Sequence, residues 1–91
     1  MIRLNCFIRV TPQHKGELLA IAKRLTEASR KQDGCIAYDI FESATNIDVL
    51  MICETWRDQL ALDAHKASSV FKLESPKMHA LAEMKLESFE F

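Results

Sequence analysis

The sequence predicts an α+β domain with the split βαβ order: strand, helix, strand, strand, helix, strand, around a four-stranded antiparallel sheet. Two observations carry this prediction. Apolar and polar residues alternate in the segments expected to be strands, whereas apolar residues recur every three or four positions in the segments expected to be helices. The length of 91 residues leaves room for one domain, which we place at residues 1–91.

The first strand is predicted at Ile2–Val10, because apolar residues occupy every second position of this segment. Thr11-Pro12 is typical of a helix N-cap followed by proline in the first turn. From Leu18 to Ser29 the apolar residues recur at helical spacing, which predicts an amphipathic helix with charged side chains facing water. Asp33-Gly34 is typical of the turn that ends such a helix.

The second and third strands are predicted at Cys35–Ser43 and Ile47–Trp56, joined by a connection of hairpin length. The third strand is apolar on both faces, since Val49, Met51 and Cys53 alternate with Leu50 and Ile52. Both of its faces therefore need to be covered, which is typical of a central strand.

A second helical region is predicted to begin at Arg57-Asp58, with the Asp58 side chain as its cap. Ser68-Ser69 is expected to restart the helix and Pro76 to interrupt it. Glu83–Phe91 is the predicted fourth strand. Its apolar residues occupy both even and odd positions, and therefore both faces of the strand. Either a bulge shifts the alternation along the strand or both faces are covered.

This order of elements is that of a ferredoxin-like domain, in which the helices cover only one face of the sheet. Apolar residues remain for the other face: Phe7, the outward half of the third strand, and Phe89 and Phe91. A monomer would expose this patch, so we expect a homodimer that packs sheet face against sheet face.

Composition excludes several function classes. The formal net charge is −1 with no stripe of basic residues, so no nucleic-acid partner is expected. The apolar runs are too short for a membrane span and the first residues do not resemble a signal peptide, which favours a cytoplasmic protein. The cysteines and histidines show no metal-ligand spacing, and the two glycines cannot form a phosphate-binding loop. The residues therefore carry no signature of a metal site or of a phosphate-bearing cofactor.

His65 is the leading candidate for a catalytic residue. It falls on the same helical face as Ala61 and Leu62, so its side chain is expected to point inward. An inward histidine can titrate near neutral pH and accept a proton from a phenolic or hydroquinone substrate. The alternative is a structural core histidine, hydrogen-bonded to a backbone carbonyl or to Glu54.

Four other residues are candidates for substrate binding. Trp56 ends the central strand, where it could form a pocket wall or anchor the helix to the sheet. Tyr38, Phe71 and Cys6 are candidates for the pocket lining, and the alternative for each is a place in the core. Glu54 needs a partner if it is buried, and the candidates are Arg57, His65 or a group across the dimer.

Several segments resemble the antibiotic-biosynthesis-monooxygenase family in order and spacing. The matching segments are Asp33-Gly34-Cys35-Ile36-Ala37-Tyr38-Asp39, Cys53-Glu54-Thr55-Trp56-Arg57-Asp58, Ala61-Leu62-Asp63-Ala64-His65 and Ser68-Ser69-Val70-Phe71. The resemblance implies a dimeric α/β barrel with one pocket per subunit between sheet and helices. It also implies oxygenase chemistry without flavin, haem or metal.

This chain departs from the family pattern at two places. Ser69-Val70 stands where members often carry Pro-His before the conserved Phe. Cys6, His65 and Ser75 fall near the Asn, Trp and His positions of the haem-degrading relatives, so the resemblance does not extend to haem degradation.

Three function hypotheses follow from different classes. The first is a cofactor-independent monooxygenase acting on a small aromatic or quinol-like substrate, with His65 as the base. The second is a non-oxidative isomerase of a small hydroxy-ketone or phosphosugar, which would need Arg9, Arg57 or Lys72 to converge on the pocket. The third is a non-catalytic ligand-binding or stress-associated dimer. For the first, we expect a closed apolar cavity of small-ligand size with His65 and Trp56 on its wall.

Overall fold

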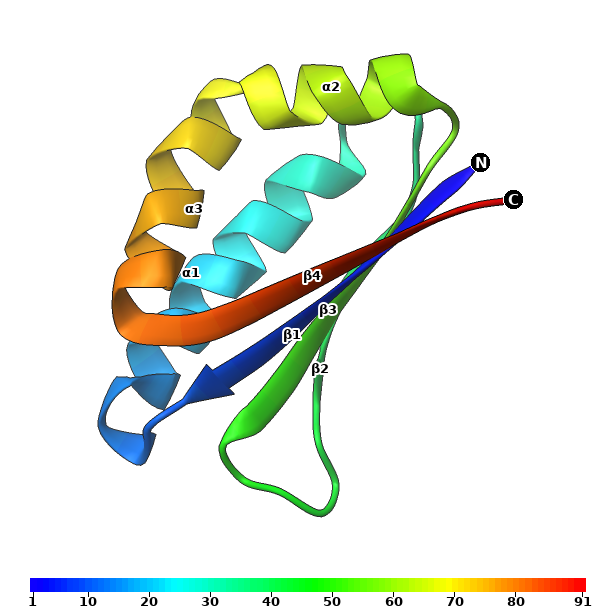
Figure 1. The fold of residues 1–91 in the computed structure, drawn as a ribbon. Helices are drawn as coiled ribbons and strands as arrows, with labels where there is room; N and C mark the ends of the chain where they lie inside the picture. Colours follow the sequence, from blue (N-terminus) through cyan, green and yellow to red (C-terminus); the bar gives the residue numbers. More distant parts are fainter.

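The computed structural model of the protein describes residues 1–91, and Figure 1 shows seven elements in the order β-α-β-β-α-α-β. Their bounds are β1 (Ile2–Val10), α1 (Pro12–Arg30), β2 (Cys35–Glu42), β3 (Val49–Trp56), α2 (Gln59–Ala67), α3 (Ser69–Leu81) and β4 (Ala82–Glu90). None of the helices combines the length and the apolar character that crossing a membrane requires.

The four strands form one antiparallel sheet in the order β2-β3-β1-β4, which confirms the predicted α+β fold. All three helices lie on one face of this sheet (Figure 1). The two chain ends lie side by side, because the first and last strands are neighbours and the Met1 ammonium donates to the Phe91 carbonyl at 2.6 Å.

The core lies between the sheet and the helices, and β1 supplies one wall of it. The alternate residues predicted to face inward on this strand are all buried: Ile2, Leu4, Cys6, Ile8 and Val10. They pack in one cluster with the apolar residues of α1, among them Leu18 and Leu25. Thr11 stands at the N-cap position as expected, although its side chain makes no capping hydrogen bond.

The second helical region consists of two helices, α2 and α3. The prediction that Pro76 interrupts the helix is wrong, because α3 continues through it. Ser68 begins α3 by accepting a hydrogen bond from the Phe71 amide at 3.3 Å, and Pro76 lies inside the helix. A helical proline costs about 3 kcal/mol. Beyond it, Met78 is fully buried and Leu81 packs against the core, and each buried side chain contributes about 1.5–3 kcal/mol. Packing of the last turn therefore outweighs the proline.

Two strand predictions also change. The connection between β2 and β3 is longer than expected, since β2 ends at Glu42 and β3 begins at Val49. β4 pairs with β1 in an unbroken register, so apolar residues do occupy both of its faces and it contains no bulge. The sheet instead shifts register in β2, between Cys35 and Ala37.

The turn after α1 is tied closely to the start of α2. Gly34 has a φ of +81°, and a side-chain carbon at this position would overlap the Ala61 methyl group on α2. The Arg57 amide donates to the Gly34 carbonyl at 2.8 Å, and the Arg57 guanidinium reaches both carboxylate oxygens of Asp33 at 3.2 and 3.4 Å. A glycine is required here both for its backbone conformation and for the close approach of α2.

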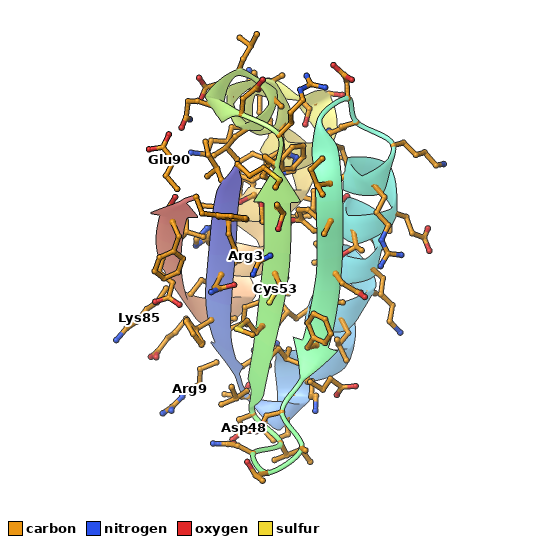
Figure 2. All side chains as sticks on the ribbon, turned by 90° about the vertical axis from the view of Figure 1, so that its right-hand side faces the viewer. Arg3, Arg9, Asp48, Cys53, Lys85 and Glu90 are labelled. Atoms are coloured by element: carbon orange, nitrogen blue, oxygen red, sulfur yellow. The ribbon has the colours of Figure 1, made fainter.

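The face of the sheet opposite the helices is open. Figure 2 looks onto it and shows Arg3, Arg9, Cys53 and Lys85 on the strands that face the viewer. Between these polar groups stand large exposed apolar side chains, namely Phe7, Phe41 and Phe89, with Phe91 beyond the end of β4.

Candidate functional site

A cavity of about 130 Å³ lies between the sheet and helices α2 and α3. Ten of its fifteen lining residues are hydrophobic, and they come from the inner face of the sheet and from all three helices. A cavity of roughly 150 Å³ lined by apolar side chains holds one benzene molecule. The space in this protein therefore matches a single six-membered ring rather than a fused ring system.

His65 projects from α2 into this region, and the prediction that it points inward is confirmed. Only 2% of its surface is exposed, and it forms part of the cavity wall. Its Nδ1 atom lies 2.7 Å from the Oε1 atom of Gln32, which is neither of the partners expected from the sequence. Its Nε2 atom is buried and has no hydrogen-bond partner in the protein.

Aromatic rings surround the imidazole on several sides. The Trp56 ring lies against it in a tilted arrangement, with centroids 4.5 Å apart and an angle of 32° between the planes. Phe71 meets it edge-on at 5.0 Å, and Tyr38 lies at 5.7 Å. These contacts fix the plane of the His65 ring, so the position of Nε2 is determined by packing.

Trp56 is not on the cavity wall, which corrects the expectation that it could contact a ligand. It is completely buried behind His65 and absent from the lining. The other predicted site residues do come together, because Tyr38, Phe71 and Cys6 line the cavity with His65.

Burial makes the imidazole a weak base. It lowers the pKa of His65 to about 4, with a smaller contribution from the positive charge of Lys66. The expectation that this histidine titrates near neutral pH is therefore wrong. At pH 7 the ring is neutral, and one of its nitrogens carries a lone pair that can accept a proton.

Glu54 is a second ionisable group on the cavity wall, with 7% of its surface exposed. Its Oε1 atom accepts a hydrogen bond from Nε1 of Trp56 at 2.8 Å, so the partners considered from the sequence (Arg57, His65 or a group across a dimer) are not the ones found within the chain. Burial raises the pKa of this carboxyl group, and the Trp56 hydrogen bond partly opposes that rise.

The remaining polar groups of the lining fall into two classes. Some do not ionise near neutral pH, and the others lie at the rim of the cavity. Burial is the main cause that raises the pKa of the Cys6 thiol to about 11, and it also raises the pKa of Tyr38. Cys6 is thus a thiol rather than a nucleophilic thiolate. The exposed side chains of Lys66 and His79, together with the half-buried Ser75, add polar atoms that the sequence had not singled out.

The three cations that the sequence offered to an isomerase of phosphorylated substrates do not converge on the cavity. Arg57 pairs with Asp33 at the surface, Arg9 stands on the open sheet face (Figure 2), and Lys72 is absent from the cavity lining. No group of three or more His, Cys, Asp or Glu side chains gathers as a metal site would require.

Comparison with known proteins gives a family match. The model of the family described as "Antibiotic biosynthesis monooxygenase" matches residues 1–73. The protein named "Putative monooxygenase YcnE" of Bacillus subtilis is 32% identical over 72 residues, which cover 79% of this chain and 76% of that protein. Matches to two other curated relatives span only 44% and 55% of their lengths.

Solved structures show the same fold. A conserved protein of unknown function from Bacteroides thetaiotaomicron, described as a possible oxidoreductase, is 50% identical and superposes with a TM-score of 0.97 over 99% of this chain and 96% of that one. SnoaB of Streptomyces nogalater, a cofactor-independent oxygenase, is similar in fold, with a TM-score of 0.89 over 99% of this chain and 91% of SnoaB, at 14% identity.

Proposed function

The chain belongs to the antibiotic biosynthesis monooxygenase family, and we propose that it uses O₂ to oxygenate a small single-ring phenol or hydroquinone without a cofactor. One observation carries the proposal. A buried, neutral histidine with an unpartnered Nε2 forms part of the wall of an apolar cavity of one-ring size. YcnE is named as a monooxygenase, and SnoaB is described as a cofactor-independent oxygenase. These words describe those two proteins, and they support the same class of reaction here.

The first chemical step is removal of a proton from the ring hydroxyl. Nε2 of His65 accepts this proton, and the resulting phenolate is electron-rich enough to give an electron to O₂. The low pKa of His65 keeps Nε2 unprotonated before substrate arrives. Once formed, the phenolate stabilises the imidazolium beside it, because an opposite charge a few ångströms away favours the charged form.

The remaining steps balance with O₂ as the sole oxidant. One electron passes from the phenolate to O₂, and the two radicals join to form a carbon–oxygen bond at the ring carbon ortho to the phenolate group, which bears a hydrogen. The peroxide takes the proton from His65, the ring carbon loses its hydrogen, and the oxygen–oxygen bond breaks with release of water. A hydroquinone plus O₂ thus gives a hydroxyquinone plus water, since the ring loses four electrons and O₂ gains four.

The walls of the cavity suit this chemistry. Most of the lining is hydrocarbon, supplied by residues such as Leu4, Ile52 and Leu62. An apolar wall keeps water away from the radical pair and the peroxide, both of which would react with it or leak protons. Ten of the fifteen lining residues are hydrophobic, and His65 and Glu54 are the buried polar ones, so a substrate with a single hydroxyl-bearing ring matches the wall in polarity.

Oxygen consumption by purified, chelator-treated protein tests the proposal. We expect enzyme-dependent uptake of one O₂ per hydroquinone or methylhydroquinone, and incorporation of one labelled atom from ¹⁸O₂ into the product. A two-ring naphthohydroquinone should react more slowly, because it exceeds a cavity of about 130 Å³. Absence of enzyme-dependent uptake across this panel would contradict the proposal. Binding of the same rings without turnover would favour a non-catalytic ligand-binding protein.

We further infer that two copies of the chain pair through the open sheet face. Phe7, Phe41 and Phe89 are exposed there, with 44–50% of their surfaces accessible, and the outward residues Met51 and Cys53 are only half-buried. Large apolar side chains on neighbouring strands of one face are typical of an interface. A two-fold arrangement would let the same patch cover itself.

Substitution of Phe7 by Glu tests this interface. We expect the wild-type protein to sediment as a dimer and Phe7→Glu to shift it toward monomer, because the interface would then replace an apolar ring by a carboxylate that must lose its water. Leu73→Glu is the matched control, since Leu73 is exposed on α3, away from the sheet face. Sedimentation velocity at several concentrations measures the effect. A monomeric wild-type protein, or a Phe7→Glu dimer of unchanged affinity, would refute the interface.

A further inference from the structure

We propose that Gln32 is a positioning residue that fixes the tautomer of His65, holding the ring proton on Nδ1 and leaving the lone pair of Nε2 toward the cavity. The catalytic meaning of this assignment rests on the proposed function, whereas the tautomer itself follows from the geometry. The key contact joins residues 33 positions apart in the chain, with 2.7 Å between Nδ1 of His65 and Oε1 of Gln32.

The backbone of Gln32 is held on both sides. Its amide donates to the Ser29 carbonyl at 3.0 Å, and its carbonyl accepts from the Cys35 amide at 3.2 Å. The next residues of the same turn are tied to α2 by the Arg57 contacts with Asp33 and Gly34. The Gln32 side chain therefore starts from a rigid turn that is anchored to the region bearing His65.

The hydrogen-bonding requirements of the pair select one tautomer. A carbonyl oxygen only accepts, so the amide oxygen of Gln32 requires a proton on Nδ1 of His65. The reverse arrangement, with the amide nitrogen donating to Nδ1, would put the proton on Nε2. That proton would be a buried donor without an acceptor, because Nε2 has no partner. Buried orphan donors are rarer and costlier than buried orphan acceptors.

The imidazole separates two environments. On one side is a surface groove that His65 shares with Gln32, Asp33 and Ser68. On the other side is the apolar cavity, whose lining includes His65 but not Gln32. Since the two ring nitrogens point in diverging directions, the nitrogen bound to Gln32 faces the groove. The second nitrogen is then directed to the cavity side, where a substrate hydroxyl would lie.

An amide suits this position better than a carboxylate. Glutamate at position 32 would also accept from Nδ1, but its negative charge would favour the protonated imidazolium. The other charged and titratable groups that line the cavity or the groove beside the ring are Lys66, Glu54, Tyr38, Cys6, His79, Asp33 and Arg57. The neutral amide thus orients the ring without adding charge, and the base stays unprotonated before substrate binds.

Nitrogen-15 NMR of the histidine ring tests the assignment directly, because protonated and unprotonated ring nitrogens have very different chemical shifts. At about pH 8, above the ordinary pKa of histidine of about 6.5, we expect Nδ1 of His65 to be protonated in the wild-type protein. Gln32→Leu removes the acceptor of the Nδ1 proton, so the share of the Nδ1-protonated tautomer should fall and the Nε2-protonated tautomer should appear. Gln32→Glu retains an acceptor oxygen and should keep the proton on Nδ1. Gln59→Leu, an exposed change on α2, should leave both signals unchanged.

The outcomes separate this inference from the proposed function. If His65 has the same tautomer in the wild-type and Gln32→Leu proteins, the role of Gln32 is overturned, whatever the activity. If the protein consumes O₂, Gln32→Leu should lower kcat by on the order of tenfold or more with little change in KM, since a base in the wrong tautomer is present but unable to accept. A changed tautomer with unchanged kcat would also overturn the positioning role. If no substrate is consumed, the NMR result still decides the tautomer.

Discussion

His65→Ala is expected to lower the rate of enzyme-dependent O₂ uptake by about 10²–10⁴-fold, the usual contribution of a general base. The physical reason is that Nε2 of His65 is a buried, unpaired nitrogen on a cavity-lining residue, whereas His79, the other histidine of the lining, is exposed. The measurement is O₂ consumption with hydroquinone under saturating substrate, after circular dichroism has confirmed the fold. A folded variant that keeps the wild-type rate would contradict the role of His65.

Two further measurements separate loss of the base from loss of packing. The substitution leaves a hole between Trp56 and Phe71, so free imidazole added to the solution should enter it and restore part of the rate. If the His65→Ala variant does not fold and added imidazole does not restore the rate, His65 is a structural residue. His14→Ala is the matched control, because this histidine is exposed near the start of α1 and far from the cavity lining.

Trp56→Ala is expected to lower the free energy of unfolding by about 3–5 kcal/mol, the cost of truncating a fully buried tryptophan. A domain of this size has a total stability of roughly 5–14 kcal/mol, so the variant should be close to unfolding at 37 °C. Urea denaturation followed by circular dichroism measures the loss. Leu60→Ala is the control, since Leu60 is 77% exposed and its loss should change stability by less than about 0.5 kcal/mol.

Trp56→Phe separates the hydrogen bond of this residue from its volume. Phenylalanine keeps most of the packing against His65 but removes the Nε1–H donor that Glu54 accepts from. The buried carboxyl group would then lack its partner, and we expect a cost of about 1–3 kcal/mol together with a further rise in the pKa of Glu54. A Trp56→Phe variant as stable as the wild type would show that this hydrogen bond contributes nothing net.

Much of the fold can be predicted from the chain because its signals are local. The alternation in Ile2–Val10 and the two-faced pattern of the third strand each depend on neighbouring residues, and both are confirmed by the register of the sheet. Pro76 shows where local signals fail. A proline penalty can be estimated from sequence, but the burial of Met78 beyond it depends on where the core lies.

The site was only partly predictable for the same reason. The helical spacing of His65 is sufficient to indicate an inward side chain. Its partner Gln32 is 33 positions away, and nothing in the spacing brings the two together, because their approach depends on the turn at Gly34. The hydrogen bond of Glu54 is hard to predict for a different reason. Trp56 lies only two residues along the same strand face, but the sequence does not show whether its indole forms a wall or donates a hydrogen bond.

Trp56 is also the single tryptophan of the chain. The ultraviolet emission of the protein at tryptophan wavelengths therefore comes from one indole, stacked on His65 and bonded to Glu54. A ligand that enters the cavity, a proton that reaches the imidazole, or the unfolding of the surrounding core would each alter the surroundings of this fluorophore. The molecule thus carries an intrinsic optical reporter at its candidate site, and ligand titrations can be followed without attaching a label.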